Sequence, residues 1–333
     1  MNDSAPIFIV SSPRSGSTLL RLLLSAHSRI AIPPPGFMFP LIYPFLHTYG
    51  DLSRTTNLDL LIEDVLEFQE NKPWPMPLSV ERVRTAMTEP GFCGVYKALK
   101  RIWCDHHNKP RWGEKTPRNI YFMAEILECF PSAQFLHICR DGRDVAIDWM
   151  ENLNWPKNVY HTALHWQESM RAIRPFRKKL NPAQLFEVKY EVLVRRPEDT
   201  LKEVCAFLQE EYEPTMFDFY RQEETIRWSE SAFCHRFLKN PINDNHVGLY
   251  QERLSPADRG MLAGLIGEEL KELGYPVEEK PRQVTPEELR NYNEDARANE
   301  VGTIKFKMRH WEKRRQRREL GIWNDEGLTK AFG

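Results

Sequence analysis

The sequence predicts an α/β fold in which helices cover both faces of a central, mostly parallel five-stranded sheet. Seven segments with helical periodicity alternate with short apolar runs, and this alternation is typical of parallel sheets. The chain of 333 residues is also long enough to bury a sizeable core. The expected strands are 7–11, 29–32, 111–113, 134–139 and 184–190, and the expected helices are 17–25, 58–69, 95–105, 119–130, 145–151, 162–179 and 197–208.

The first expected strand, 7–11, contains the run IFIV with no basic stretch before it, so it does not resemble a secretory signal. No apolar run approaches the roughly 18–20 residues that span a bilayer. The formal net charge of −1 gives no overall field that would attract nucleic acid or an anionic membrane. We therefore expect a cytoplasmic protein whose partners include neither nucleic acid nor a membrane.

The six cysteines are scattered along the chain, and none forms a C-x-x-C pair. Their spacing matches neither a metal site nor a disulfide framework. We expect reduced thiols, as in other proteins of a reducing compartment, and no bound metal.

Two stretches fall outside the alternation of strands and helices. The first, 37–92, starts with an aromatic, proline-rich part at 37–49, and we expect it to form a helical cap over the substrate. The second, 277–333, is polar, and its part 305–318 carries eight Lys or Arg against one acid. We expect a basic helical C-terminal extension there, after one domain formed by residues 1–276.

The strongest local signal is the segment 11–20, SSPRSGSTLL, which follows the first strand and opens a helix. A turn centred on Gly16 lets backbone N–H groups converge, and the helix start adds unpaired donors and a positive dipole end. Arg14 adds a cation. Ser15, Ser17 and Thr18 add hydroxyl donors. We interpret the turn as a phosphate-binding loop, although a plain strand-to-helix turn is the simpler alternative.

The next strand end carries the segment 112–118, WGEKTPR, which also turns into a helix. Lys115 would lie near Arg14 if the two strands are neighbours in the sheet. Taken on its own, this segment favours a simpler interpretation, a surface lysine followed by a proline at a helix start.

A third segment, 135–145, reads FLHICRDGRDV and places two arginines after a buried strand. Arg140 and Arg143 are three residues apart and could bind one phosphate with their guanidinium forks. An Arg/Asp ion-pair network at the helix start explains the same residues equally well.

In this order and spacing, the three segments resemble the 3′-phosphoadenosine 5′-phosphosulfate (PAPS)-dependent sulfotransferases, and most closely the bacterial and tyrosylprotein branch with its P-R-S-G-[ST]-T loop. The segments 188–193, 196–201 and 270–275 resemble later motifs of that family, so the similarity covers about residues 5–276. The resemblance implies a P-loop-like three-layer fold and PAPS as the co-substrate, with no metal.

The resemblance also implies a role for each matching residue. Ser15, Gly16, Ser17 and Thr18 would hold the 5′-phosphosulfate, and Arg14 and Lys115 would stabilise charge during sulfuryl transfer. Arg140 would bind the 3′-phosphate, and Tyr190 would lie near the adenosine. The acceptor would be a hydroxyl or amine of a small molecule, and a homodimer is left open.

The sequence departs from the family at three positions. Pro35 occupies the place of the glutamate base of the tyrosylprotein branch, Asp148 replaces a serine near the 3′-phosphate arginine, and Asn243 replaces a later serine. A carboxylate at Asp148 would repel phosphate unless a neighbouring arginine neutralises it. As a substitute base we favour His47 narrowly over Glu114.

Two other functions remain open at this stage. The first is a non-catalytic nucleotide-binding protein of the same fold, which the chain would be if no other residue replaces the glutamate base whose place Pro35 occupies. A P-loop kinase is disfavoured, because the loop at 11–20 lacks the Lys-Ser/Thr pair and the sequence offers no clear magnesium-binding aspartate.

Overall fold

The computed structural model describes residues 4–70, 76–151, 158–231 and 235–298. Its centre is a five-stranded sheet in the order β2-β3-β1-β4-β5, and all four strand pairs are parallel. The predicted fold class is therefore confirmed, and so is the position of each predicted strand. The strands are β1 (Ile7–Val10), β2 (Ile30–Ala31), β3 (Arg111–Lys115), β4 (Gln134–Cys139) and β5 (Leu185–Lys189).

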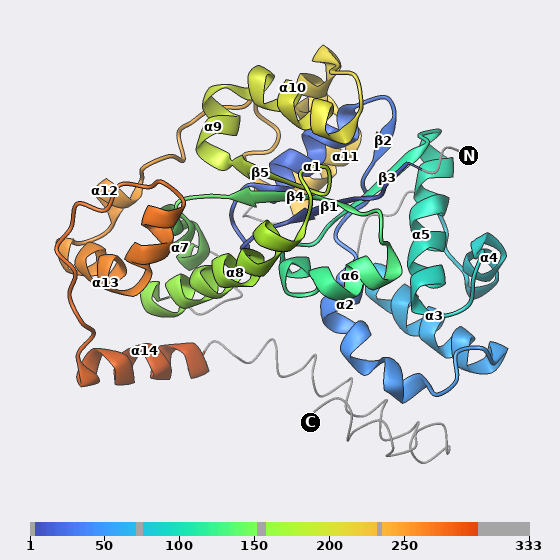
Figure 1. The fold of residues 1–333 in the computed structure, drawn as a ribbon, viewed down its shortest axis with the longest axis horizontal. Coiled ribbons are helices and arrows are strands. Elements are labelled where there is room, and N and C mark those ends of the chain that lie inside the picture. Colours follow the sequence, from blue (N-terminus) through green and yellow to red (C-terminus); the bar gives the residue numbers. More distant parts are fainter. Residues whose placement is uncertain (1–3, 71–75, 152–157, 232–234, 299–333) are drawn as a thin grey trace.

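The apolar residues of the strands alternate between two cores, one on each face of the sheet. Phe8 and Phe135 belong to one core, together with residues of helices α3, α5 and α6. Ile7 and Ile9 belong to the other, with residues of α1, α9 and α10. Figure 1 shows these two helix layers above and below the sheet. The predicted three-layer arrangement follows from this burial of both faces.

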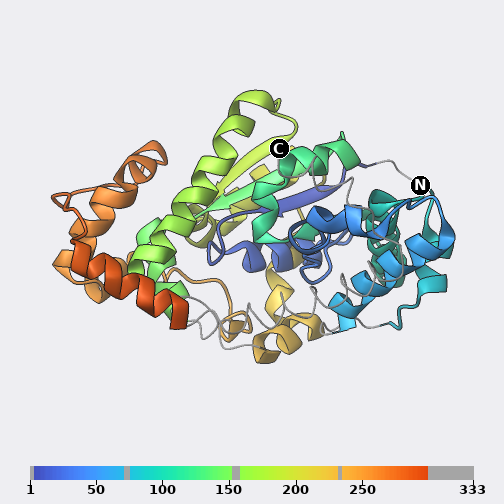
Figure 2. The ribbon, with the colours of Figure 1, turned by 90° about the horizontal axis from the view of Figure 1, so that it is seen from below.

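Helices extend the molecule beyond both ends of the sheet. Figures 1 and 2 show α3 and α4 at one end and α12 to α14 at the other. The described α-helices are α1 (Ser17–Ala26), α2 (Met38–Leu41), α3 (Thr55–Glu70), α4 (Val80–Ala86), α5 (Phe92–His107), α6 (Met123–Cys129), α7 (Gly142–Met150), α8 (Val159–Lys179), α9 (Tyr190–Arg195), α10 (Pro197–Leu208), α11 (Glu223–Ser231), α12 (Tyr250–Arg253), α13 (Pro256–Glu272) and α14 (Pro286–Ala298). The described 3-10 helices are η1 (Tyr43–Tyr49), η2 (Pro117–Tyr121) and η3 (Pro214–Arg221).

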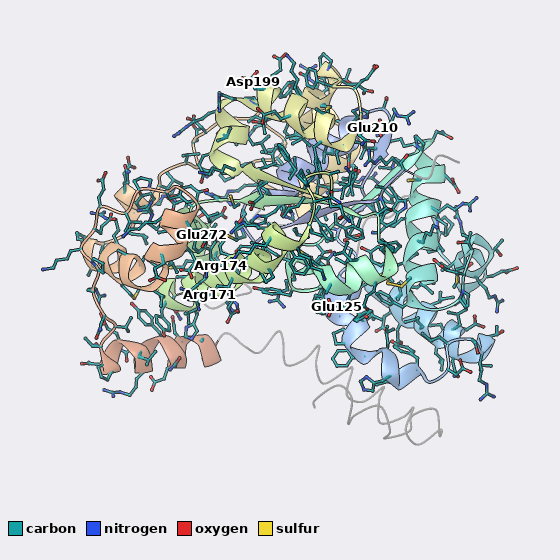
Figure 3. All side chains as sticks on the ribbon, viewed as in Figure 1. Glu125, Arg171, Arg174, Asp199, Glu210 and Glu272 are labelled. Atoms are coloured by element: carbon teal, nitrogen blue, oxygen red, sulfur yellow. A yellow bond between two sulfur atoms is a disulfide. The ribbon has the colours of Figure 1, made fainter. Side chains whose placement is uncertain are left out.

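Helices α8 and α13 are held together by an apolar core and by ion pairs at its border. Arg171 Nε lies 2.9 Å from Glu269 Oε1, and Arg174 Nη2 lies 2.6 Å from Glu272 Oε2. Figure 3 shows Arg171, Arg174 and Glu272 side by side. These contacts fix α13 against α8, whose partner α7 carries residues of the candidate site.

The start of the predicted C-terminal extension packs on the rest of the chain. The Tyr292 ring on α14 stacks on Tyr160 of α8 at 5.4 Å between ring centres, and Asn158 donates to the Tyr292 carbonyl oxygen at 3.1 Å. The basic part, 305–318, lies outside the described residues. The division of the chain at residue 276 stays a prediction.

One structural expectation from the cysteines is wrong. Cys93 at the start of α5 and Cys129 at the end of α6 form a disulfide, drawn as a yellow bond in Figure 3. The two residues are 36 positions apart, so no local spacing motif announces the pair. The fold brings α5 and α6 onto the same face of the sheet, so their cysteines can meet. Three other described cysteines, Cys104, Cys139 and Cys205, are buried free thiols.

Candidate functional site

The candidate site lies at the carboxyl edge of the sheet, where ligands of parallel α/β sheets bind. Strands β1, β3, β4 and β5 are parallel, so the segments that follow them meet at this edge. They border a cleft of about 440 Å³. Its walls come from the phosphate loop, the ends of β3 and β4, helix α7 and the segment 235–253.

The phosphate loop connects β1 to α1 through two residues with left-handed backbone conformations, Arg14 at φ 69° and Gly16 at φ 87°. A Cβ atom on Gly16 would lie 2.4 Å from Cδ2 of Tyr190, so this close approach also requires glycine. Gly16, Ser17 and Thr18 line the cleft. Ser15 is fully buried and does not belong to the described cleft lining.

Lys115 comes to the phosphate loop because β3 pairs directly with β1. Ile9 is opposite Lys115 in the parallel register, and Lys115 Nζ donates to Thr18 Oγ1 at 3.0 Å. Lys115 is 5% exposed and lines the cleft. Lys115 was expected beside the loop only if β1 and β3 are neighbours in the sheet. They are, so Lys115 lies where it was expected.

Arg140, at the end of β4, forms the second cationic position. It is buried and donates through Nη1 to the Arg14 carbonyl oxygen at 3.0 Å and through Nη2 to the His246 carbonyl oxygen at 2.8 Å. Its guanidinium also lies over the Tyr190 ring, 4.8 Å from the ring centre. Several independent contacts therefore fix the orientation of Arg140.

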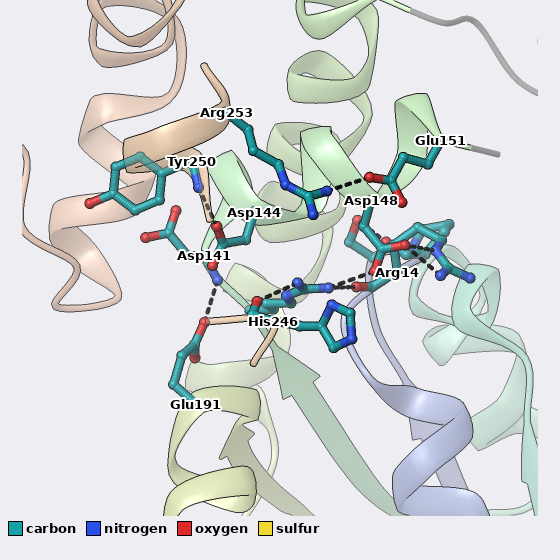
Figure 4. A network of polar contacts seen from close by, with 12 residues as sticks. Arg14, Asp141, Asp144, Asp148, Glu151, Glu191, His246, Tyr250 and Arg253 are labelled. Atoms are coloured by element: carbon teal, nitrogen blue, oxygen red, sulfur yellow. Dashed lines mark hydrogen bonds and ion pairs between the residues drawn. The ribbon is translucent and has the colours of Figure 1, made fainter. Parts of the chain in front are cut away.

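Asp148 on α7 connects the two arginines of the site. Arg14 donates to Asp148 Oδ1 from Nε at 3.0 Å and from Nη2 at 2.5 Å, and Arg140 donates to Oδ2 at 2.8 Å (Figure 4). Burial favours the neutral acid, but the two guanidinium groups outweigh burial and hold the pKa of Asp148 below its ordinary value. Asp148 is therefore an ionised carboxylate between two cations.

Arg143 belongs to an ion-pair network, as the alternative interpretation of the third segment expected. Its Nε and Nη2 atoms donate to Asp141 at 2.9 and 2.7 Å, and its guanidinium stacks 3.8 Å above the Tyr250 ring. Arg143 does not belong to the described lining of the cleft. The expectation that it shares a phosphate with Arg140 is therefore not met.

The segment 235–253 forms a wall of the cleft that sequence analysis did not assign to the site. Asp144 on α7 fixes this wall, because its carboxylate accepts from the backbone N–H of Gly248 at 2.6 Å and of Tyr250 at 2.9 Å. Figure 4 shows the contact between Asp144 and Tyr250 and the nearby ion pair of Arg253 with Glu151. The wall is thus tied to the helix that also carries Asp148.

His235 lines the cleft from this wall. Burial, and then the positive charges of Lys115, Arg14 and Arg21, lower the pKa of His235 to about 3. The imidazole is therefore neutral near pH 7. Sequence analysis missed this residue because a single histidine carries no pattern that marks it as functional.

Glu114 and His47, the two predicted bases, lie elsewhere. Glu114 is 1% exposed, pairs with buried Lys100, and accepts from the Gly36 N–H at 3.0 Å. His47 lies in η1, and neither residue belongs to the described cleft lining. A base role for either residue stays a prediction that its position outside the described cleft lining does not support.

The predicted substrate cap contributes less to the cleft than expected. Among the described residues of 37–92, Phe37 lines the cleft, and the others do not. Helix α3 instead supplies Leu61, Ile62 and Val65 to the core that it shares with α5. A cap role for this segment stays a prediction.

The structure describes no cluster of three or more His, Cys, Asp or Glu side chains arranged to hold a metal ion. Among the described helices, none combines the length and apolar character that crossing a membrane would require.

Comparisons with known proteins agree with the fold. A family model described as "Sulfotransferase family" matches residues 6–214. An uncharacterized protein of Aquifex aeolicus is 25% identical over 229 residues, which are 67% of this chain and 28% of that protein. The protein-tyrosine sulfotransferase of Drosophila melanogaster is 25% identical over 241 residues, which are 71% of this chain and 41% of that enzyme. The chain therefore matches less than half the length of both relatives.

Two solved structures share the fold. The sulfotransferase domain from the curacin biosynthetic pathway is 22% identical, with a TM-score of 0.58 over 82% of this chain and 98% of that domain. The sulfotransferase domain of the Synechococcus PCC 7002 olefin synthase is 20% identical, with a TM-score of 0.55 over 83% of this chain and 98% of that domain. These likenesses show a P-loop-like α/β fold. The family match over residues 6–214, which is more than half of the chain, shows that the chain belongs to the sulfotransferase family.

Proposed function

We propose that the protein transfers a sulfuryl group from PAPS to a hydroxyl or amine of a small-molecule acceptor and releases adenosine 3′,5′-bisphosphate. The observation that carries this proposal is the presence of two cationic positions in one cleft. Arg14 and Lys115 lie at the phosphate loop, and Arg140 lies at the end of a different strand. A donor with a 5′-phosphosulfate and a separate 3′-phosphate matches both positions.

The 5′ end of the donor would bind at the phosphate loop. Backbone N–H groups at Gly16 and at the start of α1 would bind this end, as helix N-termini bind anions, and Ser17 and Thr18 line the same cleft. Ser15 contributes its backbone to the turn. Tyr190, whose ring packs against Gly16 and Arg140, would contact the adenosine.

Sulfuryl transfer, like phosphoryl transfer, needs positioning and cations around the transferring oxygens more than covalent catalysis. Lys115 and Arg14 would stabilise the negative charge that develops on the leaving phosphate. The proposed sulfuryl transfer requires no metal ion.

His235 would remove the acceptor proton in place of the family glutamate, whose position Pro35 occupies. In the free protein, burial and then the nearby cations keep the pKa of His235 low. The bound donor would neutralise much of the charge of Lys115 and Arg14, so the part of the lowering that these cations cause would be relieved and the pKa of His235 would rise. His235 would then be a stronger base toward the acceptor.

The acceptor would carry an apolar or aromatic group next to its hydroxyl or amine. Part of the described cleft lining is apolar and comes from three regions of the chain: Phe37, Phe219, Phe237, Ile242 and Leu249. A phenol fits this combination of an apolar body and a single polar tip.

A non-catalytic nucleotide-binding role is the second candidate. Two observations favour it. Pro35 lines the cleft in place of a carboxylate, and Asp148 forms ion pairs with both Arg14 and Arg140. Binding experiments do not separate this role from catalysis, but turnover does.

The donor site is tested by thermal unfolding with added nucleotides. Adenosine 3′,5′-bisphosphate should raise the melting temperature more than ATP does, because ATP lacks the 3′-phosphate. Magnesium should change neither shift. Equal shifts with both nucleotides would remove the argument for a 3′-phosphate site at Arg140, and a strict magnesium requirement would favour a kinase.

A further inference from the structure

Asp148 holds the position between the two arginines that the donor needs. Each of its carboxylate oxygens accepts from a different arginine, Oδ1 from Arg14 and Oδ2 from Arg140 (Figure 4). The two donors lie 134 and 8 residues from Asp148 in sequence, so only the fold joins them. A side-chain carboxylate thus lies where an anionic ligand would meet both guanidinium groups.

Arg140 has few hydrogen-bond donors left for a ligand. A guanidinium has five N–H groups, and three of those of Arg140 go to Asp148, the Arg14 carbonyl and the His246 carbonyl. Its Nε is buried and has no hydrogen-bond partner among the described residues. A phosphate therefore gains one further N–H of Arg140 after Asp148 has released it.

Arg140 does not depend on Asp148 for its orientation. The two backbone carbonyls hold Nη1 and Nη2, and the Tyr190 ring supports the guanidinium face. The Asp148 side chain is 27% exposed, whereas that of Arg140 is 3% exposed. The carboxylate can therefore turn toward solvent while Arg140 stays in place.

We propose that Asp148 is an internal counter-anion that competes with the donor's 3′-phosphate for the arginines of the site and so limits donor affinity. This inference rests on the proposed function. It makes Asp148 a specificity-determining residue, because a nucleotide without a 3′-phosphate does not have to displace the carboxylate from Arg140. Removing the charge of Asp148 should therefore favour adenosine 3′,5′-bisphosphate over 5′-AMP.

The test measures binding affinities by isothermal titration calorimetry. Adenosine 3′,5′-bisphosphate and 5′-AMP are each titrated into wild type, Asp148→Asn and Asp148→Ser. The Asn variant keeps the shape of the side chain, and the Ser variant restores the residue type of the family. Glu151→Gln is the matched control, since it removes a charge from the same cleft wall but pairs with Arg236 and Arg253 instead. Melting temperatures verify that each variant is folded.

Both Asp148 variants should bind the bisphosphate about 10- to 100-fold more tightly, the fold-change that corresponds to a charged hydrogen bond. Binding of 5′-AMP should change less, and Glu151→Gln should leave the ratio of the two affinities as in wild type. Unchanged or weaker bisphosphate binding by folded Asp148 variants would overturn the inference, and so would an equal gain for both nucleotides. If neither wild type nor any variant binds the bisphosphate, the proposed function itself fails.

Discussion

At the scale of single residues, the protonation state of His235 depends on its burial and then on its cationic neighbours. The pKa of about 3 means that the folded protein does not bind a proton at His235 above about pH 4. The unfolded chain binds this proton below about pH 6.5, the ordinary value. Between these pH values the unfolded state holds more protons, so the stability contributed by neutral His235 is lost as the pH falls.

We predict that wild type loses stability on acidification from pH 6.5 to 4 more steeply than His235→Gln. The difference should approach about 1.4 kcal/mol per pH unit at most. Urea unfolding of both proteins at several pH values measures it. Parallel stability curves would show that His235 is protonated in the folded protein, contrary to its burial beside Lys115.

We also predict that His235→Ala lowers kcat by about 10²–10⁴-fold, the usual contribution of a general base. Added imidazole should restore part of the rate, because it can enter the space left by the side chain. His47→Ala is the control and should keep the wild-type rate. A His235→Ala variant with full activity would exclude His235 as the base.

At the scale of elements, a buried ion pair joins α5 to β3 and to the proline turn before α2. Lys100 and Glu114 are 2% and 1% exposed, and Glu114 also accepts from Thr116 Oγ1 at 2.6 Å. We predict that Glu114→Gln destabilises the protein by about 3–5 kcal/mol, because it leaves the Lys100 charge buried without its counter-ion. Urea unfolding measures the loss.

The double variant Lys100→Met/Glu114→Gln is the control for this pair, since it removes both charges and should cost less than the single change. If Glu114→Gln keeps wild-type stability and loses turnover instead, Glu114 is the base after all.

The disulfide between Cys93 and Cys129 joins two helices on one face of the sheet. It closes a loop with a sequence separation of 36 residues, so we predict a contribution of about 3–4 kcal/mol to the free energy of unfolding. A reducing agent should lower the melting temperature of wild type and leave that of Cys93→Ser/Cys129→Ser unchanged. Equal melting temperatures of wild type with and without reductant would contradict this prediction.

At the scale of the whole molecule, local patterns predicted the parts of the site that lie on single segments. The loop at 11–20, the strand end at Lys115 and the arginine at Arg140 each combine a buried strand with a following helix start, and this pattern is visible in the sequence. Their convergence needed the strand order, which places β1 between β3 and β4.

The rest of the site depends on long-range contacts that leave no local pattern. Asp144 binds the backbone of Gly248, 104 residues away, and thereby makes the segment 235–253 a wall of the cleft. Asp148 appeared from sequence to be an obstacle to phosphate, and the fold pairs it with the arginine 134 residues away. The roles of His235 and Glu114 followed from their neighbours, which the sequence does not reveal.

The measurement that tests the account most directly is turnover of PAPS with a panel of phenols, primary amines and a tyrosine-containing peptide. Sulfated product and adenosine 3′,5′-bisphosphate are quantified together by mass spectrometry and chromatography. The account predicts equal amounts of both with at least one acceptor, without magnesium. Lys115→Ala should reduce the rate by about 10²–10³-fold, whereas Lys97→Ala, at an exposed position, should not change it. Tight binding of the bisphosphate without release of bisphosphate from PAPS for any acceptor would contradict the account and favour a non-catalytic protein.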